Sequence, residues 1–418
     1  MTTEEQVFDA PISPVMAEVV ESHRADPYPV YRHYRETAPM HRADPGLWTL
    51  TRYDDILAVL RDDRFSVDPR KATALAELRE ETIEASGDDS FDFMGNAAGR
   101  VLLFTDPPDH TRLRVLVNKA FTPRTVERLR AHITELVNGM LDDVAGNKEM
   151  DVIADLAYPL PALVICELMG VPLEDRDLFR GWSGDVAPIL DPWLPPGALE
   201  KAMGTLGNFA LYFLGLMEKR REAPQDDLVS ALLAAENEKD RLANDELMAL
   251  CVLVFIAGHE TTQNLIGNGL LALLRNPDQM SKLSNDPSLA KSAVEELLRY
   301  DSPVQLTART ATAEIEVGGT VIPEGELAVV LLGAGNRDPA VFTDPDRLDI
   351  TREKTSVLSF GAGAHFCLGA GLARLEGQIV FNALLSRFPN LELATDEPQW
   401  RDTITLRGLH SLPVRWSA

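Results

Sequence analysis

Hydrophobic residues recur at helical spacing along most of the chain, and polar or proline-containing pairs mark the ends of several runs. The longest run extends from about Asn244 to Leu274 and stops at Asn276-Pro277, because proline cannot continue a helix. A second run follows Asp286-Pro287, a typical helix start, and reaches about Tyr300. Two further helices are expected, one over Leu113–Phe121 after the turn Asp106-Pro107-Pro108 and one between Cys367 and Pro389. Helix should therefore dominate the fold.

Patterns typical of β-strands are fewer and shorter. Glu314–Val317 and Thr320–Ile322, joined by Gly318-Gly319, predict a hairpin, and Glu326–Leu332 predicts a single apolar strand. The tail around Thr403–Val414 is expected to form another hairpin. No repeat or flexible linker divides the chain, so we expect a single, mainly α domain over residues 1–418 with small peripheral β-sheets. The stretches 71–99 and 188–197 are expected to be irregular, either as surface loops or as lids over a buried site.

The composition narrows the class of protein. The 45% hydrophobic and 25% charged residues are ordinary for a globular protein, and the net charge of -25 argues against a nucleic-acid partner. Three cysteines are too few for a disulfide framework in a chain of this length, which favours a reducing cytoplasm. The N-terminus shows no secretory leader, and the densest apolar patch, Val252–Ala257, is too short to span a bilayer. We expect a cytoplasmic protein that does not enter a membrane.

The segment FGAGAHFCLG, which ends at Gly369, is the strongest chemical signal in the sequence. Its glycines permit a tight turn and a close approach of the backbone to a flat ligand. Cys367 directly precedes a predicted helix, where amide N–H groups and the helix dipole favour the thiolate form. A thiolate is a good axial ligand for haem iron and favours cleavage of the O–O bond.

Two other roles are possible for a cysteine in the position of Cys367. An inert, buried thiol is the common case, and it suits Cys166 and Cys251, which lie in apolar helical patterns, better than it suits Cys367. A zinc site is disfavoured because no second cysteine or histidine lies at finger-type spacing from Cys367.

The segment resembles the haem-binding signature of the cytochrome P450 family. The matching residues are Phe360, Gly363, His365, Cys367 and Gly369, and other family motifs recur in the expected order from about residue 100 to the C-terminus. The resemblance implies the cytochrome P450 fold, with haem b buried between the long central helix and the cysteine loop. It implies that Cys367 binds the iron, that Phe360 packs near the sulfur, and that His365 contacts a haem propionate. Gly361 belongs to the same expected cofactor-binding loop.

A polar stretch interrupts the longest apolar run at Ala257-Gly258-His259-Glu260-Thr261-Thr262. The resemblance implies that this is the oxygen-binding groove, in which Ala257 and Gly258 border the haem and the glycine opens space over the iron. Glu260 would then relay protons from solvent, and Thr261 would hold the bound dioxygen and its water. Threonine can also bond to its own helix carbonyls, and a solvated polar patch at Glu260 and Thr261 is the alternative. His259 faces elsewhere and is given no role.

Several charged residues match structural or haem-binding positions of the family. Glu296 and Arg299 lie three residues apart and share a helix face. By resemblance they form, with Arg347, a buried network that supports the cysteine loop. His110 and Arg114 share one helical face and, by resemblance, bind haem propionates. The resemblance adds Arg309 to the groups that bind the propionates.

The residues that contact the substrate are also given by the resemblance, and they are mostly apolar. They are Leu102, Val254, Val304, Leu306 and Leu406. A mostly hydrophobic small molecule is therefore expected, because few polar anchors line such a pocket. No reductase segment is visible, so electrons should come from a separate ferredoxin and its reductase. A basic surface of Arg112, Lys119, Arg124 and Arg374 is a candidate docking site for that ferredoxin.

These expectations together indicate a haem-thiolate monooxygenase that uses O2 to hydroxylate or epoxidise its substrate. Two alternative functions are consistent with the sequence. A peroxygenase driven by hydrogen peroxide is disfavoured because such enzymes typically lack the acid–alcohol pair that Glu260 and Thr261 provide. A non-catalytic haem sensor would have no need of that pair either.

Overall fold

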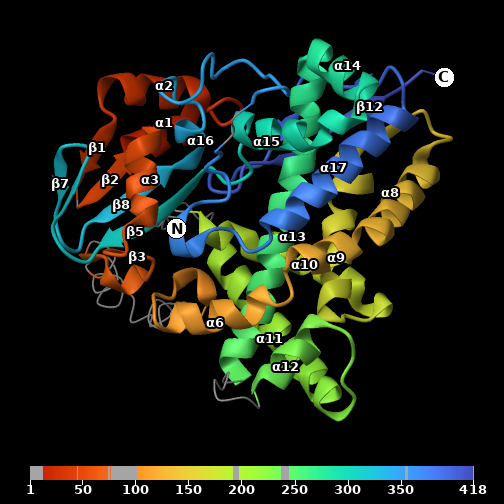
Figure 1. Cartoon of the computed structure of the whole chain (residues 1–418), viewed down its shortest axis with the longest axis horizontal. Helices are drawn as coiled ribbons and strands as arrows, with labels where there is room; N and C mark the ends of the chain where they lie inside the picture. The colour runs from red at the N-terminus through yellow and green to blue at the C-terminus, as the bar shows by residue number, and fades with distance from the viewer. Residues whose placement is uncertain are drawn as a thin grey trace, which may run out of the picture.

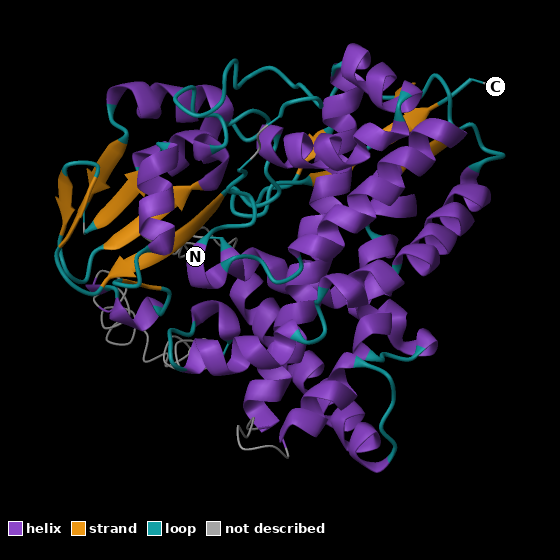
Figure 2. Ribbon diagram, viewed as in Figure 1, coloured by secondary structure: helices purple, strands orange, loops and turns teal. Residues whose placement is uncertain are grey.

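The computed structural model describes residues 13–44, 46–73, 76, 101–191, 197–236, 244–353 and 356–417. Helices predominate, and short strands gather in two separate places (Figure 2). The expectation of a mainly α fold with small peripheral sheets is confirmed. The irregular stretch 71–99 lies almost entirely outside the described residues, as do residues 192–196 of the stretch 188–197, which begins within a 3-10 helix (Ala187–Leu190).

The helices have the following bounds. The first ten are α1 (Pro14–Ser22), α2 (Tyr28–Thr37), α3 (Tyr53–Arg61), α6 (Asp109–Asn118), α7 (Pro123–Arg128), α8 (Arg130–Val144), α9 (Pro159–Met169), α10 (Arg176–Val186), α11 (Ala198–Glu222) and α12 (Leu228–Glu236). They are followed by α13 (Asn244–Arg275), α14 (Pro277–Asn285), α15 (Ala290–Tyr300), α16 (Leu332–Gly335) and α17 (Ala370–Arg387).

The strands form four small sheets among the described residues. They are β1 (Met40–Ala43), β2 (Leu47–Leu50), β3 (Phe65–Ser66), β4 (Glu149–Asp151), β5 (Leu306–Ala311), β6 (Ile315–Val317), β7 (Thr320–Ile322), β8 (Leu327–Leu331), β9 (Glu392–Leu393), β10 (Gln399–Trp400), β11 (Leu409–Ser411) and β12 (Pro413–Arg415). The largest sheet has the order β1-β2-β8-β5-β3, in which only β2 and β8 are parallel.

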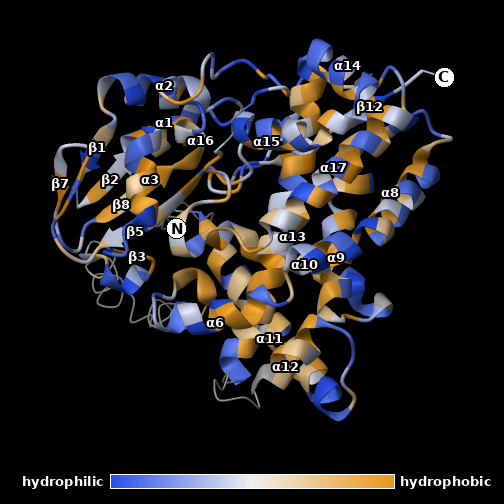
Figure 3. Ribbon diagram, in the orientation of Figure 1, coloured by the Kyte–Doolittle hydropathy of each residue, from blue (hydrophilic) through white to orange (hydrophobic). Residues whose placement is uncertain are grey.

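The five-stranded sheet and most of the helices occupy opposite sides of the molecule. The five-stranded sheet lies on one side with α1, α2 and α3, whereas α6 to α15 and α17 fill the other side (Figure 1). Helix α13 crosses the middle of the helical part and is apolar along much of its length (Figure 3). By length and composition α13 is able to cross a membrane, but 67% of its most apolar window is buried, as in the core helix of a folded domain.

Most elements expected from the pattern are present, with changes at their ends. Helix α13 begins at Asn244 and α17 ends at Arg387, both as predicted, and β6 and β7 form the expected hairpin. Helix α6 starts at Asp109, four residues before the predicted start, because it begins directly after the proline turn.

The predicted C-terminal hairpin does not form. Strand β11 pairs with β10, whereas β12 pairs with β4 and β9, so the two strands lie in different sheets. Leu409, Leu412 and Val414 are fully buried. Both strands therefore pack into the core, where each pairs with another part of the chain.

Candidate functional site

The cysteine loop folds through two glycines with left-handed backbone angles. Gly361 has φ 66° and Gly363 has φ 70°, and a Cβ at Gly363 would lie 2.3 Å from the carbonyl oxygen of Leu60. The N–H of Cys367 donates to the carbonyl of Phe360 at 2.9 Å, which closes the turn. Gly369 has φ -82° and open space where a Cβ would be. A Cβ at position 369 would therefore cause no backbone strain and would meet no atom of the described residues within 4 Å.

The sulfur of Cys367 lies at the start of α17, as the sequence suggests. Backbone N–H groups of Gly369 and Ala370 and the guanidinium of Arg114 favour the thiolate and lower the pKa of Cys367. Burial has the larger effect, so the pKa of the Cys367 thiol is raised overall. The N–H groups at the start of the helix therefore favour the thiolate, as expected, whereas burial of the sulfur opposes it. A cation bound to the sulfur is what would complete the deprotonation.

Cationic and donor groups gather beside the loop. The rings of His110 and His365 have their centroids 4.0 Å apart, and Arg114 donates to the carbonyl of Phe366 at 2.5 Å. Burial, His110, Arg309 and Arg114 together lower the pKa of His365 to about 3. The four predicted propionate-binding residues are therefore close enough to interact electrostatically.

The charges in this cluster are not balanced by the acids of the described residues. Arg309 is buried, and within the described ranges it bonds only to Thr307 and to the carbonyl of Ala308, at 3.1 and 2.7 Å. Burial lowers the pKa of Arg309 to about 10. Nε2 of His110 is buried without a hydrogen-bond partner. The nearest acid, Asp106, is bonded to Ser66, to Lys71 and to the backbone of Val67. An anionic ligand with buried carboxylates fits such a site, and haem propionates are ligands of this kind.

Helix α13 presents an accessible face near its middle. Ala257 is exposed and Gly258 and Thr261 are partly exposed, although most of the surrounding helix is buried. The hydroxyl of Thr261 donates to the carbonyl of Ala257 at 2.7 Å, which is the local bond that threonine makes inside helices.

The contacts of Gly258 explain why a glycine is needed at this position, and the explanation differs from the expected one. A Cβ at this position would lie 2.7 Å from Cδ1 of Ile165 in α9. The glycine therefore allows α9 and α13 to approach each other closely, and the expectation that it opens space over the iron is not supported by its contacts. Ala257, Gly258 and Thr261 are all accessible, and Ala257 is the most exposed of the three.

Glu260 is buried and paired, which excludes the solvated alternative. It is fully buried, and its Oε2 accepts a charged hydrogen bond from Arg401. Its Oε1 has no partner, and no bond joins Glu260 to Thr261 among the described residues. No sequence motif predicts Arg401 as the partner of Glu260, because it lies 141 residues farther along the chain. His259 faces elsewhere, as expected, and its Nε2 lies 3.1 Å from the carbonyl oxygen of Tyr158.

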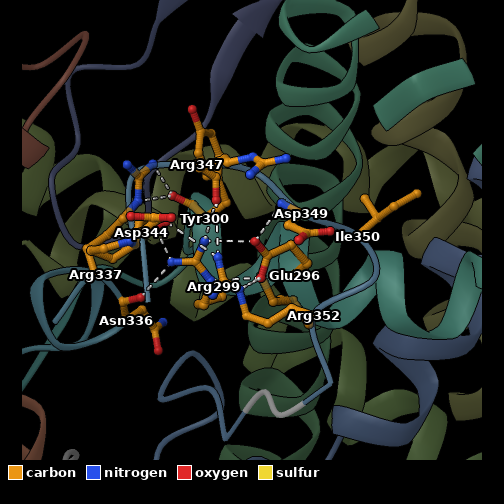
Figure 4. Close-up of polar contacts among 12 residues, drawn as sticks. Glu296, Arg299, Tyr300, Asn336, Arg337, Asp344, Arg347, Asp349, Ile350 and Arg352 are labelled. Atoms are coloured by element: carbon orange, nitrogen blue, oxygen red, sulfur yellow. Dashed lines mark hydrogen bonds and ion pairs between the residues drawn. The ribbon is translucent and has the colours of Figure 1, made fainter. Parts of the chain in front are cut away.

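The buried network behind the loop is shown in Figure 4. Glu296 and Arg299 are fully buried and bonded through both carboxylate oxygens at 2.8 Å (Figure 4). Arg299 also donates to the carbonyl of Asn336 at 3.0 Å, and the side-chain oxygen of Asn336 accepts from the N–H of Leu358 at 2.7 Å. This chain of bonds ends two residues before Phe360. The network therefore supports the cysteine loop, as expected.

The prediction that Arg347 is the third member of the network is wrong. The side chain of Arg347 is exposed, and only its carbonyl oxygen accepts a bond from Arg299, at 3.2 Å. Arg352 occupies the position instead, with its Nε 3.1 Å from Oε2 of Glu296 (Figure 4). The backbone turns between residues 347 and 352, which a sequence motif does not show.

The expected substrate contacts lie in neighbouring elements. Leu102, in a short 3-10 helix (Leu102–Phe104), and Val254 in α13 are both buried in the main core cluster. Val304 and Leu406 form an isolated antiparallel bridge, and Leu306 follows in β5. The bridge brings two of these residues together although they are about a hundred positions apart in the sequence.

The sequence profile of the family described as cytochrome P450 matches residues 70–414. The chain belongs to the cytochrome P450 family. Cytochrome P450 107B1 of Saccharopolyspora erythraea is 48% identical over 88% of this chain and 89% of its own length. The 6-deoxyerythronolide B hydroxylase of the same organism is 39% identical over 94% of this chain and 97% of its own length.

A solved structure extends the likeness to three dimensions. The crystal structure of P450BioI, in complex with an acyl carrier protein that carries hexadec-9Z-enoic acid, is 40% identical and aligns with a TM-score of 0.88. The alignment covers 96% of this chain and all of that chain. The chain is therefore a cytochrome P450 monooxygenase with a haem-iron cofactor, and its cysteine loop and α13 have the family's fold around them.

Proposed function

We propose that this cytochrome P450 binds haem b through Sγ of Cys367 and inserts one oxygen atom from O2 into a mostly hydrophobic small molecule. The observation that carries the proposal is the cysteine loop itself, with its unbalanced cluster of His110, Arg114, Arg309 and His365 beside the sulfur. Bound haem would supply the redox chemistry that activates dioxygen. The four side chains would hold its propionates, and Phe360, Gly361 and Gly369 would border it on the cysteine side.

Proton delivery is assigned to Glu260 and Thr261. Reduction of O2 to one inserted oxygen atom and one water consumes two protons, which must come from solvent. Glu260 is buried next to α13's accessible face and has one free carboxylate oxygen. Arg401 holds the other oxygen and thereby fixes the position of the carboxylate. Thr261 would then pass the proton onward, with its hydroxyl released from the carbonyl of Ala257.

The proposed substrate is apolar. Leu102, Val254, Val304, Leu306 and Leu406 offer hydrocarbon surface, and such a lining selects ligands by shape and apolar area. The relatives support this class, because one is named a 6-deoxyerythronolide B hydroxylase and another was crystallised with hexadec-9Z-enoic acid on an acyl carrier protein. Hydroxylation or epoxidation are the reactions proposed, in a secondary-metabolic role.

The proposed electron donor is a ferredoxin in the cytoplasm. Two residues of the expected docking surface are in fact paired with acids: Arg112 with Glu246 and Arg374 with Glu295. Lys119 and Arg124 are exposed. The proposed contact therefore depends on the last two residues and on the rim of the loop, where Phe366 is 41% exposed.

Two other functions are less well supported. A peroxygenase would take hydrogen peroxide in place of O2 and electrons, and a haem sensor would not turn over a substrate at all. The buried acid Glu260, with its free oxygen and its arginine partner, is needed by neither. Efficient turnover with peroxide alone would favour the first, and binding without product would favour the second.

The test combines spectroscopy with one substitution and a control substitution. The purified protein should bind haem and, when reduced under carbon monoxide, should show the absorption shift of a thiolate-ligated iron. Cys367→Ser should abolish that shift, whereas Cys166→Ser, in a buried helix position, should keep it. A colourless protein, or an unchanged spectrum in the Cys367 variant, would overturn the proposal.

A further inference from the structure

Helix α11 presents an apolar face to solvent. Leu211 is 72% exposed, which is the largest value among the exposed large hydrophobic side chains of the described residues, and Leu214 is 39% exposed. Gly204 and Gly207 lie two turns and one turn before Leu211 on the same side of the helix. We call this surface, made of Gly204, Gly207, Leu211 and Leu214, the leucine–glycine face. Adjoining exposed apolar side chains are a common mark of a surface that binds another protein.

No contact of the described residues explains the two glycines of this face. A Cβ at Gly204 or at Gly207 would meet no neighbouring atom within 4 Å, whereas a Cβ at Gly258 would lie 2.7 Å from Ile165. Glycine weakens a helix interior relative to alanine, and it is useful there where another backbone comes close. For Gly204 and Gly207 such a backbone would have to come from outside the chain.

The opposite face of α11 holds the helix in a fixed orientation. Phe209 and Phe213 are fully buried. The ring centroid of Phe209 lies 5.5 Å from that of Phe179 in α10 and 5.5 Å from that of Phe255 in α13. Because a closely packed core of this kind resists rotation of the helix, the leucine–glycine face stays directed at solvent.

The leucines and the glycines are arranged symmetrically about position 209. Gly207 and Leu211 are each two residues from this position, before it and after it. Gly204 and Leu214 are each five residues from it. In an antiparallel crossing of two copies of the helix, with the two-fold axis at position 209, each glycine faces a leucine of the other copy. Each large side chain then enters the space that a glycine leaves, as ridges enter grooves between packed helices.

Exposed charged residues at the two ends of α11 fit the same arrangement. Glu200 and Lys201 lie near the start of the helix, and Glu218 and Lys219 lie near its end. An antiparallel crossing therefore brings two acids and two bases together at each end. This local neutrality matters because the net charge of -25 otherwise makes two copies repel each other. The pair that Lys201 forms with Asp185, at 2.7 Å, is at the surface and weak.

We propose that the leucine–glycine face of α11 binds the same face of a second copy of this chain and so forms a two-fold symmetric dimer. The helix has 25 residues and is therefore about 37 Å long. One pair of helices of this length is a small interface compared with the roughly 1,200–2,000 Å² that stable complexes bury. The dimer is therefore reversible and forms at micromolar concentrations. It does not depend on the proposed activity.

The first test is sedimentation velocity of the haem-loaded protein from low to high micromolar concentration. We expect an equilibrium between monomer and dimer that shifts toward dimer as the concentration rises. The series should stop at the dimer, because a two-fold interface uses the same face on both copies and is then closed. A protein that stays monomeric, or that forms larger species in an open series, would overturn the proposal.

The second test compares Leu211→Glu with a matched control, Val321→Glu. Val321 is also an exposed apolar residue, 44% accessible, but it lies in β7. Leu211→Glu places a carboxylate in the centre of the interface and should raise the Kd of the dimer at least tenfold, whereas the control should leave it unchanged. If both variants dimerise as the unaltered protein does, or if both fail to, the leucine–glycine face is not the interface.

The third test separates loss of the dimer from loss of the fold. Gly207→Leu should raise the temperature of unfolding of the dilute monomer, because leucine favours helix and the space at this position is open. The same variant should raise the Kd of the dimer at least tenfold, because leucine fills the space for the other copy's leucine. A more stable variant that dimerises as before would show that no helix approaches Gly207.

The register of the dimer is tested with single cysteines. Cys166 and Cys251 are buried and Cys367 is the proposed haem ligand, so an added cysteine on α11 reacts apart from them. Under mild oxidation, a mixture of Gly207→Cys and Leu211→Cys chains should form disulfide-linked dimers several-fold faster than either variant alone. Cross-linking at equal rates in the mixture and in the separate variants would contradict the pairing of each glycine with a leucine.

Discussion

Two glutamates of this cytochrome P450 are equally buried but differ in how fully they are bonded. Glu296 bonds to Arg299 through both oxygens, to Arg352 and to the N–H of Asp349. Within the part of the chain that the structure describes, Glu260 bonds only to Arg401, and its Oε1 has no partner. A carboxylate whose lone pairs are all occupied can hold a structure together, but it cannot accept a proton without breaking it. The free oxygen of Glu260 is therefore what the proposed proton-carrying role requires and what Glu296 lacks.

The sharpest test of this comparison is Glu296→Gln. It leaves the buried guanidinium of Arg299 without a counter-charge, so we expect the free energy of unfolding to fall by about 3–5 kcal/mol. Denaturant unfolding of the haem-loaded protein measures this change. A loss below about 1 kcal/mol would mean that the network is not structural.

Glu260→Gln should show the opposite balance between activity and stability. Arg401 is partly exposed and can turn to water, so the loss of stability should be about 1 kcal/mol. The rate of product formation should fall roughly 100-fold, because the variant cannot carry a proton. Turnover and unfolding should be measured on the same preparation. Equal turnover by the two glutamine variants, after correction for the folded fraction, would contradict the distinction drawn here.

Two arginines near Glu296 allow a matched test of the structural role of the buried network. Arg352→Ala removes a charged hydrogen bond to Glu296 and should cost about 2 kcal/mol. Arg347→Ala removes only an exposed side chain, since the carbonyl that bonds to Arg299 remains, and should change stability by less than about 0.5 kcal/mol. Thermal unfolding followed at the haem absorption band compares the two. The reverse order would restore Arg347 as the third member of the network.

The smallest effect is expected at a third carboxylate, Asp191. It accepts N–H bonds from Ile404 and Thr405 and has no ion pair among the described residues, and burial raises its pKa to about 6. Because the folded pKa lies above the unfolded one, ionisation of Asp191 costs stability above pH 6 and costs none below the unfolded pKa. Asp191→Asn should therefore gain stability relative to the parent as the pH rises from about 4 to 6 and then hold it. Unfolding measured across this range would contradict the assignment if the difference were flat.

Local signals in the sequence were enough for much of the fold and for the core of the site. The helix from Asn244, the glycine hairpin near Gly318 and the loop around Cys367 each depend on residues that are close together in the chain. Their capping residues, glycine turns and spacing act within a few positions, so a pattern can be interpreted without knowing what packs against it.

Long-range partners were not accessible in this way. Arg401 reaches Glu260 across 141 residues, and Gly258 is required by Ile165 in another helix. The same holds for Arg352 in place of Arg347 and for strands β11 and β12, which separate into different sheets. In each case a side chain or strand meets a partner that no spacing rule connects to it.

The order of residues thus established the family and singled out Cys367 and the acid on the central helix as candidate site residues, because each lies in a short motif. Packing in three dimensions decided which oxygen of that acid is free, which arginine completes the buried network and how burial outweighs the N–H groups that face the Cys367 sulfur. The reason is physical. Bonding, desolvation and the approach of helices depend on distances between segments, and these exist only once the chain has folded.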